Sequence, residues 1–165
     1  MPHATVNDRR IEYRMILGDA GRPTLVFLHE GLGCVALWRE FPDRLAKALR
    51  CPAVVYSRLG YGQSDGLNAG THDRRNARFM HDEALVALPM LLDTLGIENP
   101  ILVGHSDGAS IALIHAASSG RDVAGVVLMA PHVFVEAVTV KAIAKIAISI
   151  GTPPAQRAIP CCETD

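Results

Sequence analysis

The sequence predicts an α/β fold, a mainly parallel sheet with helices on both faces. Short apolar runs alternate with longer segments of helical periodicity, as expected for repeated strand–helix units. The strand-like runs are continuously apolar rather than alternating, which is typical of strands covered on both sides. Hydrophobic residues make up 49% of the chain and the mean hydropathy is +0.20. The 165 residues are enough for one domain with its own core.

The first predicted elements are two strands and a helix. Residues 11–17 and 24–28 read as strands joined by a tight turn at 18–21, and we expect them to form a hairpin. The glycine-rich stretch His29–Gly33 follows directly as a loop. A helix should then run to about Leu49, since apolar residues recur there at four-residue spacing. These residues are Leu37, Phe41, Leu45 and Leu49.

The next unit is strand 52–56, a turn-rich loop over 58–66 and a helix from about Asn76 to Leu95. The loop glycines do not have the spacing G-x-G-x-x-G, so the sequence does not indicate a dinucleotide site. The helix carries Leu85, Leu88, Leu92 and Leu95 on one side. Gly96 should end it.

The stretch Ile101–Ile114 contains the strongest functional signal. An apolar strand leads into Gly104-His105-Ser106-Asp107-Gly108, which matches G-x-S-x-G, and a small-residue helix follows to about Ser118. A serine held at strained backbone angles on such a turn requires neighbours that are nearly free of side chain, and both glycines meet that need. An ordinary loop with a surface serine is the alternative, but the flanking strand and helix favour the catalytic turn.

Strand 124–129 follows, and ligands of such sheets bind at the carboxyl ends of the strands. His29–Gly33, Ser106 and His132 all follow strands directly and should meet at this edge. The net charge is −1 and no basic patch is present, which argues against nucleic acid and anionic membranes as partners.

The sequence does not indicate a membrane protein, a metal site or a cofactor site. The first ten residues lack an apolar leader, and the longest uncharged run, 123–135, is too short to span a bilayer and contains Pro131. The four cysteines show neither a disulfide framework nor metal-ligand spacing. We therefore expect a cytoplasmic protein with no cofactor and no metal.

Residues from about 11 to 147 resemble the α/β-hydrolase superfamily. His29–Gly33 is similar to its His-Gly-x-Pro oxyanion loop, Gly60–Ser64 to its G-x-G-x-S loop, and Gly104–Gly108 to its nucleophile elbow. The resemblance implies hydrolysis of an ester or other acyl bond in a small-molecule substrate, with Ser106 as nucleophile. The backbone N–H groups of Asp107 and Gly31 would form the oxyanion hole, although Glu30 stands where most relatives carry glycine.

The same resemblance implies that the usual acid and histidine of the triad follow later strands, and neither is present here. Residues 131–136 resemble the entry to the lid, an alanine- and isoleucine-rich helix should reach about Ile150, and 151–165 have no periodicity. We therefore expect a hydrolase core over 1–150, truncated after its sixth strand and the start of the lid, and an unstructured tail over 151–165.

Two questions stay open at this point. His132 is either a structural histidine or a substitute base oriented by Glu136 or Asp107. Activity is expected to be impaired or absent, because a serine without a base is a weak nucleophile. The alternative function is a non-catalytic module that self-associates through the open sheet edge at 124–129. Cleavage of a carbon–halogen bond would normally need a carboxylate in place of Ser106.

Overall fold

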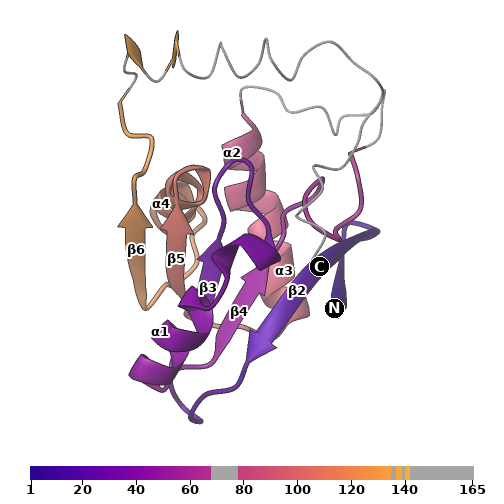
Figure 1. The fold of residues 1–165 in the computed structure, drawn as a ribbon, viewed down its shortest axis with the longest axis vertical. Coiled ribbons are helices and arrows are strands. Elements are labelled where there is room, and N and C mark those ends of the chain that lie inside the picture. Colours follow the sequence, from indigo (N-terminus) through magenta and orange to yellow (C-terminus); the bar gives the residue numbers. More distant parts are fainter. Residues whose placement is uncertain (68–77, 135–136, 139, 142–165) are drawn as a thin grey trace.

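A computed structural model describes residues 1–67, 78–134, 137–138 and 140–141, and Figure 1 shows its fold. Six strands form one sheet in the order β1-β2-β4-β3-β5-β6. The strands are β1 (His3–Val6), β2 (Arg9–Ile16), β3 (Leu25–Leu28), β4 (Ala53–Tyr56), β5 (Ile101–His105) and β6 (Gly125–Met129). β3 runs parallel to β4 and β5, and β5 runs parallel to β6, so the predicted mainly parallel sheet is confirmed. The predicted boundary at residue 150 and the tail 151–165 lie outside the described residues, as does the helix leading to them except at residues 137–138 and 140–141, which are helical.

The predicted pairing of strands 11–17 and 24–28 in a hairpin is wrong. β2 pairs antiparallel with β1 and with β4, whereas β3 lies between β4 and β5. Asn7 and Asp8 form the tight turn of the true hairpin, with φ of 49° and 58°, the left-handed angles that two-residue hairpin turns require. All four residues of β3 are buried, which suits the centre of the sheet, while only Ile11 and Glu12 of β2 are buried.

Each central strand contributes to two apolar cores. Val26, Val54 and Leu102 face the core formed with the helices after β4 and β5, whereas Phe27, Val55 and Val103 face the opposite core. The second core includes Ala46 of α1 (Phe41–Leu49), which lies on the near face of the sheet in Figure 1. The predicted layers, helices on both faces of one sheet, are therefore confirmed.

The helix predicted to run from the first loop to Leu49 is interrupted. A 3₁₀ turn, η1 (Val35–Trp38), ends at Arg39, whose φ of 51° breaks the helical path before α1 begins. The predicted common face is wrong, because Leu37, Phe41 and Leu49 are each more than 40% exposed. Pro42 and Ala46 are the buried residues of α1.

The second predicted helix is confirmed within the described residues. It consists of α2 (Phe79–Asp82), the π-helical turn η2 (Glu83–Ala87) and α3 (Leu88–Thr94). Leu88 and Leu92 are buried, and Leu85 and Leu95 pack partly buried against the same core. Gly96 follows with a φ of 64°, the left-handed conformation that commonly ends a helix.

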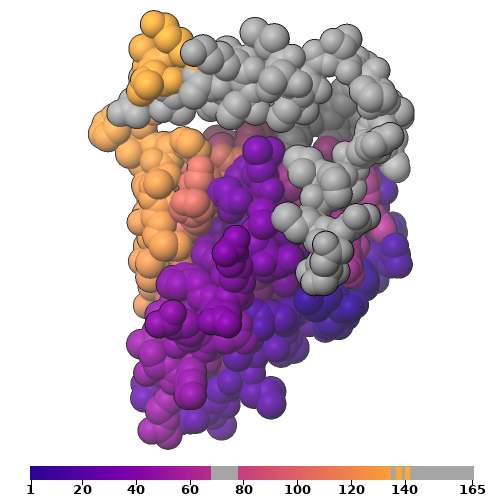
Figure 2. Space-filling view, viewed as in Figure 1, coloured from indigo at the N-terminus to yellow at the C-terminus, as the bar shows by residue number. Residues whose placement is uncertain are grey.

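β6 stands at one end of the strand order, after β5 and the helix α4 (Asp107–Ser118). Val126 and Val127 are 39% and 45% exposed. The orange region that contains β6 forms the upper part of the left border of the molecule in Figure 2.

Two further findings bear on the sequence predictions. Cys51 is a buried free thiol, whereas Cys34 is part of a disulfide, which the cysteine spacing did not indicate. Within the part of the chain that the structure describes, no helix is long and apolar enough to cross a membrane.

Candidate active site

The predicted sharp turn between β5 and α4 is present. Ser106 occupies it with φ 52° and ψ −116°, a combination that side-chain-bearing residues rarely adopt. A Cβ at Gly104 would lie 2.4 Å from the carbonyl oxygen of Gly108, and a Cβ at Gly108 would lie 2.0 Å from that of Leu28. Both glycines are therefore required by close backbone contacts, which hold α4 against β5 and β3.

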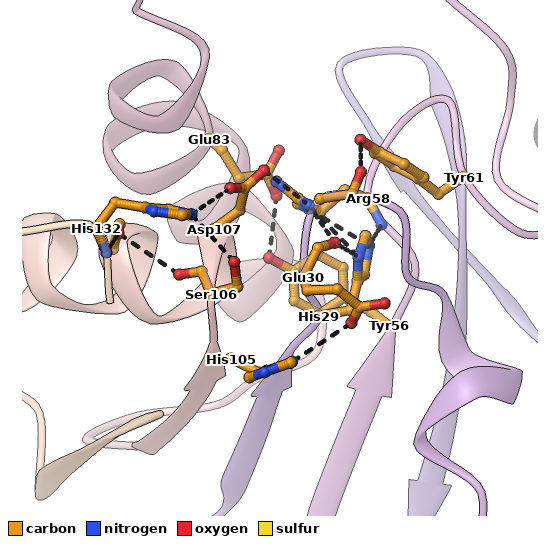
Figure 3. A network of polar contacts seen from close by, with 12 residues as sticks. His29, Glu30, Tyr56, Arg58, Tyr61, Glu83, His105, Ser106, Asp107 and His132 are labelled. Carbon is orange, nitrogen blue, oxygen red and sulfur yellow. Dashed lines mark hydrogen bonds and ion pairs between the residues drawn. The ribbon is translucent and has the colours of Figure 1, made fainter. Parts of the chain in front are cut away.

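His132 lies at hydrogen-bond distance from the serine. Its Nε2 is 3.0 Å from Ser106 Oγ (Figure 3). Backbone contacts fix both partners, because the N–H of Ser106 donates to the carbonyl of Met129 at 2.8 Å and the N–H of His132 donates to Ser110 Oγ at 2.8 Å. Ser106 and His132 therefore meet at the carboxyl edge of the sheet, and a role of His132 as a base stays a prediction.

Asp107 shares the same ring nitrogen. Its Oδ1 is 3.1 Å from His132 Nε2, while its Oδ2 lies 4.0 Å from Arg58 Nη2. The Asp107 side chain is only 16% exposed and that of Arg58 only 3%. Of the two acids expected to orient His132, Asp107 is therefore in contact with it, and Glu136 lies outside the described residues.

The loop after β3 is held by donors from the loop after β4. Arg58 Nη2 donates to the carbonyl of Glu30 at 2.8 Å, and the hydroxyl of Tyr61 donates to the carbonyl of Gly31. Because the described peptide bonds are trans, the N–H of Gly31 points opposite to the Glu30 carbonyl and away from Arg58. A Cβ at Gly31 would lie 2.8 Å from Asp107 Oδ2, so this loop and the start of α4 are in close contact.

His29 has a structural position. Its ring is fully buried, and Nε2 accepts the backbone N–H of Arg58 at 3.0 Å. Nδ1 must then carry the proton, which it donates to the carbonyl of Glu30 at 2.6 Å. His105 has its Nδ1 3.7 Å from Glu30 Oε2, and its side chain is 46% exposed.

Sequence reasoning did not identify Arg58, Tyr61 or Ser110 as neighbours of the site. Arg58 stacks over the ring of Tyr61 at 5.1 Å from its centroid, which fixes the guanidinium under the first loop. The sequence signal for Arg58 was its place between a buried strand and a glycine-rich turn. A charged residue at such a place is usually expected to be exposed to solvent.

A buried carboxylate anchors the loop that carries Arg58 and Tyr61. Glu12 on β2 is 4% exposed and accepts hydrogen bonds from Ser57 Oγ at 2.7 Å and from the N–H of Gln63 at 2.8 Å. Ser57 Oγ in turn accepts the N–H of Val35 at 2.9 Å. The network joins β2, the end of β4 and the start of η1, the segments that flank the site.

Tyr56 adds a second buried polar contact next to the site. Burial raises the pKa of its hydroxyl well above the usual value, and the neighbouring Glu83 carboxylate adds to this effect. The hydroxyl therefore stays protonated and donates to Glu83 Oε1 at 3.0 Å. No group of three or more potential ligands within the described residues is arranged to hold a metal ion.

Comparison with known proteins identifies the family. A family model described as alpha/beta hydrolase fold matches residues 23–146, and the chain belongs to this family. None of the curated proteins matches the chain.

Solved structures agree with the family assignment. An alpha/beta hydrolase fold protein from Burkholderia ambifaria is 24% identical with a TM-score of 0.70, covering 92% of this chain and 53% of its own. Haloalkane dehalogenase DbeA from Bradyrhizobium elkani is 27% identical with a TM-score of 0.62, covering 79% and 41%. Est816, described as an N-acyl homoserine lactone degrading enzyme, is 21% identical with a TM-score of 0.62, covering 79% and 45%. The chain thus spans about half the length of the structures that it matches.

Proposed function

We propose that this chain acts on ester or related acyl bonds of small molecules, with Ser106 as the nucleophile. The observation that carries the proposal is the pairing of a serine at φ 52° with a histidine nitrogen 3.0 Å from its hydroxyl. A nucleophile and a base within 2.6–3.2 Å is the geometry that hydroxyl activation requires.

In this reaction Ser106 Oγ attacks the acyl carbon and its proton passes to His132 Nε2. The oxyanion that forms would receive hydrogen bonds from the N–H of Asp107 and the N–H of Gly31. Asp107 is the first residue of α4, where the helix itself supplies no acceptor for the backbone N–H. A Cβ at Gly31 would lie 2.8 Å from Asp107 Oδ2, and this proximity of the two residues supports the pairing of their N–H groups.

The chemistry of the side chain at the turn favours acyl transfer over other bonds that relatives in this family cleave. DbeA is described as a haloalkane dehalogenase. Displacement of a halide would normally call for a carboxylate nucleophile, whereas this chain carries a serine at the turn. An acyl bond is the substrate that a serine hydroxyl with a histidine partner can attack directly.

The test is turnover of a small activated ester, p-nitrophenyl acetate, together with labelling by a fluorophosphonate. We expect slow labelling that is lost in Ser106→Ala and reduced in His132→Ala. Ester turnover that does not change in either variant would contradict the proposal, since a contaminating esterase would then account for it.

A second candidate function is a non-catalytic module that associates through β6. The observation that favours it is the end position of β6 in the sheet, with Val126 and Val127 both more than one third exposed. An apolar edge strand is a template for pairing with another chain. Under this proposal, Ser106→Ala leaves association unchanged, whereas a charge introduced on β6 abolishes it.

A further inference from the structure

We infer that Asp107 restrains the base that it contacts: its carboxylate holds the proton on His132 Nε2, the nitrogen that must be unprotonated to accept the Ser106 proton. This inference deepens the proposed function and rests on it. Asp107 acts here as a positioning residue, because it acts on the reaction through His132.

The distances define a competition for one nitrogen. His132 Nε2 lies 3.0 Å from Ser106 Oγ and 3.1 Å from Asp107 Oδ1. Among the described residues, both polar contacts of the ring are made through Nε2 (Figure 3). In the usual arrangement of a serine, histidine and acid, the acid contacts Nδ1 and leaves Nε2 for the serine. Here the acid and the serine meet the same atom.

Only one protonation pattern satisfies the carboxylate. An ionised carboxylate can only accept hydrogen bonds, so a contact of 3.1 Å with Nε2 is favourable when Nε2 carries a proton and repulsive when Nε2 presents a lone pair. A protonated Nε2 can donate to Asp107 Oδ1 and cannot take the proton of Ser106. The base form of His132 therefore requires the hydrogen bond to Asp107 to be lost.

The surroundings strengthen this preference. The Asp107 side chain is 16% exposed, which limits the competition from water for its oxygens. Oδ2 faces Arg58 Nη2 at 4.0 Å, and this buried guanidinium helps to hold the carboxylate in place. The ionised carboxylate also lies against Gly31, whose N–H is a proposed oxyanion donor, so its negative charge opposes the oxyanion as well.

The reaction with a fluorophosphonate isolates the step concerned. Ser106 Oγ forms a bond to phosphorus, fluoride leaves, and the hydroxyl proton passes to Nε2. Asp107→Ala removes the carboxylate and keeps the backbone N–H that the oxyanion needs. Loss of a hydrogen bond to a charged group changes the rate of a step that depends on it by about ten- to hundredfold. We expect the labelling rate of Ser106 to rise by about this factor.

The matched control is Glu30→Gln, which removes another carboxylate from the same edge of the sheet. Glu30 Oε2 lies 3.7 Å from His105 Nδ1 rather than at His132. If Glu30→Gln raises the labelling rate as much as Asp107→Ala does, a general field effect explains the result and the inference is wrong. An unchanged or lower rate in Asp107→Ala also overturns it.

A direct measurement on the unmodified chain does not depend on activity or on how any variant folds. Nitrogen-15 spectra of the histidine rings at about pH 8 report which ring nitrogen carries the proton, with His132 assigned from the signals missing in His132→Gln. We expect Nε2 of His132 to carry the proton, and Asp107→Ala to lower that share. An unprotonated Nε2 in the unmodified chain overturns the inference. Labelling that is independent of Ser106 overturns the proposed function instead, and the spectra then decide the inference about Asp107.

Discussion

Replacing Gly108 with alanine should destabilise the fold strongly, although alanine is the better helix residue. The new Cβ would lie 2.0 Å from the carbonyl oxygen of Leu28 and 2.4 Å from its carbonyl carbon, far inside the 3.4 Å at which ordinary contact begins. Both atoms belong to the backbone of the central strand β3, which cannot move without disturbing its pairing with β4 and β5.

The magnitude follows from two opposing effects. Overpacking of a core costs about 1–3 kcal/mol where flexible side chains can adjust, and a clash with backbone lies at the upper end of that range. Alanine recovers about 1 kcal/mol relative to glycine inside a helix. The unfolding free energy should therefore fall by about 2 kcal/mol, which lowers the urea midpoint by about 1 M.

Urea unfolding followed by circular dichroism and by the fluorescence of Trp38, the only tryptophan, measures this change. Gly125→Ala is the control, because a Cβ at Gly125 meets no atom within 4 Å and its φ is not left-handed. Its unfolding free energy should stay within about 0.5 kcal/mol of that of the unmodified chain. Equal midpoints for the two alanine variants would refute the close approach of α4 to β3.

Two other predictions concern α4 and β6. His115 is fully buried and donates from Nδ1 to the carbonyl of Ala84, and burial, with a smaller contribution from Arg121, lowers its pKa below 6.5. As the pH falls, the unfolded chain binds the proton before the folded chain does, so the unfolding free energy should decrease from about pH 7 towards pH 5. His115→Gln, which does not titrate, should flatten this slope. An unchanged slope in the variant would show that His115 does not cause it. Light scattering at about tens of micromolar should show that the chain self-associates. Val127→Lys on β6 should make it monomeric, whereas Val86→Lys on η2, where the side chain is 49% exposed against 45% for Val127, should not. A monomeric unmodified chain would contradict this.

The order of the strands could be predicted less well than the strands themselves. The apolar runs identified β3, β4 and β5, because residues buried on both faces leave a local signal. Which strand pairs with which depends on contacts distant in sequence. The turn at residues 18–21 suggested a hairpin, yet β3 lies between β4 and β5 and pairs with both.

The face of α1 was mispredicted because a spacing of four residues has meaning only within one continuous helix. The break at Arg39 separates Leu37 from the residues that follow it. Inside α1 the sheet side is occupied by the small residues Pro42 and Ala46. Of the four large residues expected on this face, Leu45 packs partly buried against the core.

At the candidate site the backbone was predictable and the side-chain geometry was not. Gly104 and Gly108 indicated a strained turn at Ser106 because few other residues fit there. The motif carries no information about side-chain rotamers, so it could not indicate that Asp107 and Ser106 meet one nitrogen of His132. That detail depends on how β6 aligns with β5, which only the folded chain defines.

The buried carboxylate of Glu12 bears on where a minimal folding unit can be cut. The family match starts at residue 23 and leaves β1 and β2 outside it. A fragment trimmed to that start would lose the acceptor for Ser57 Oγ and for the N–H of Gln63, both of which donate to Glu12. The buried hydroxyl of Ser57 and the partly buried N–H of Gln63 would lose this acceptor beneath the loop that carries Arg58. The segment matched by the family is therefore shorter than the segment needed for a stable fold, which includes β2 and its Glu12.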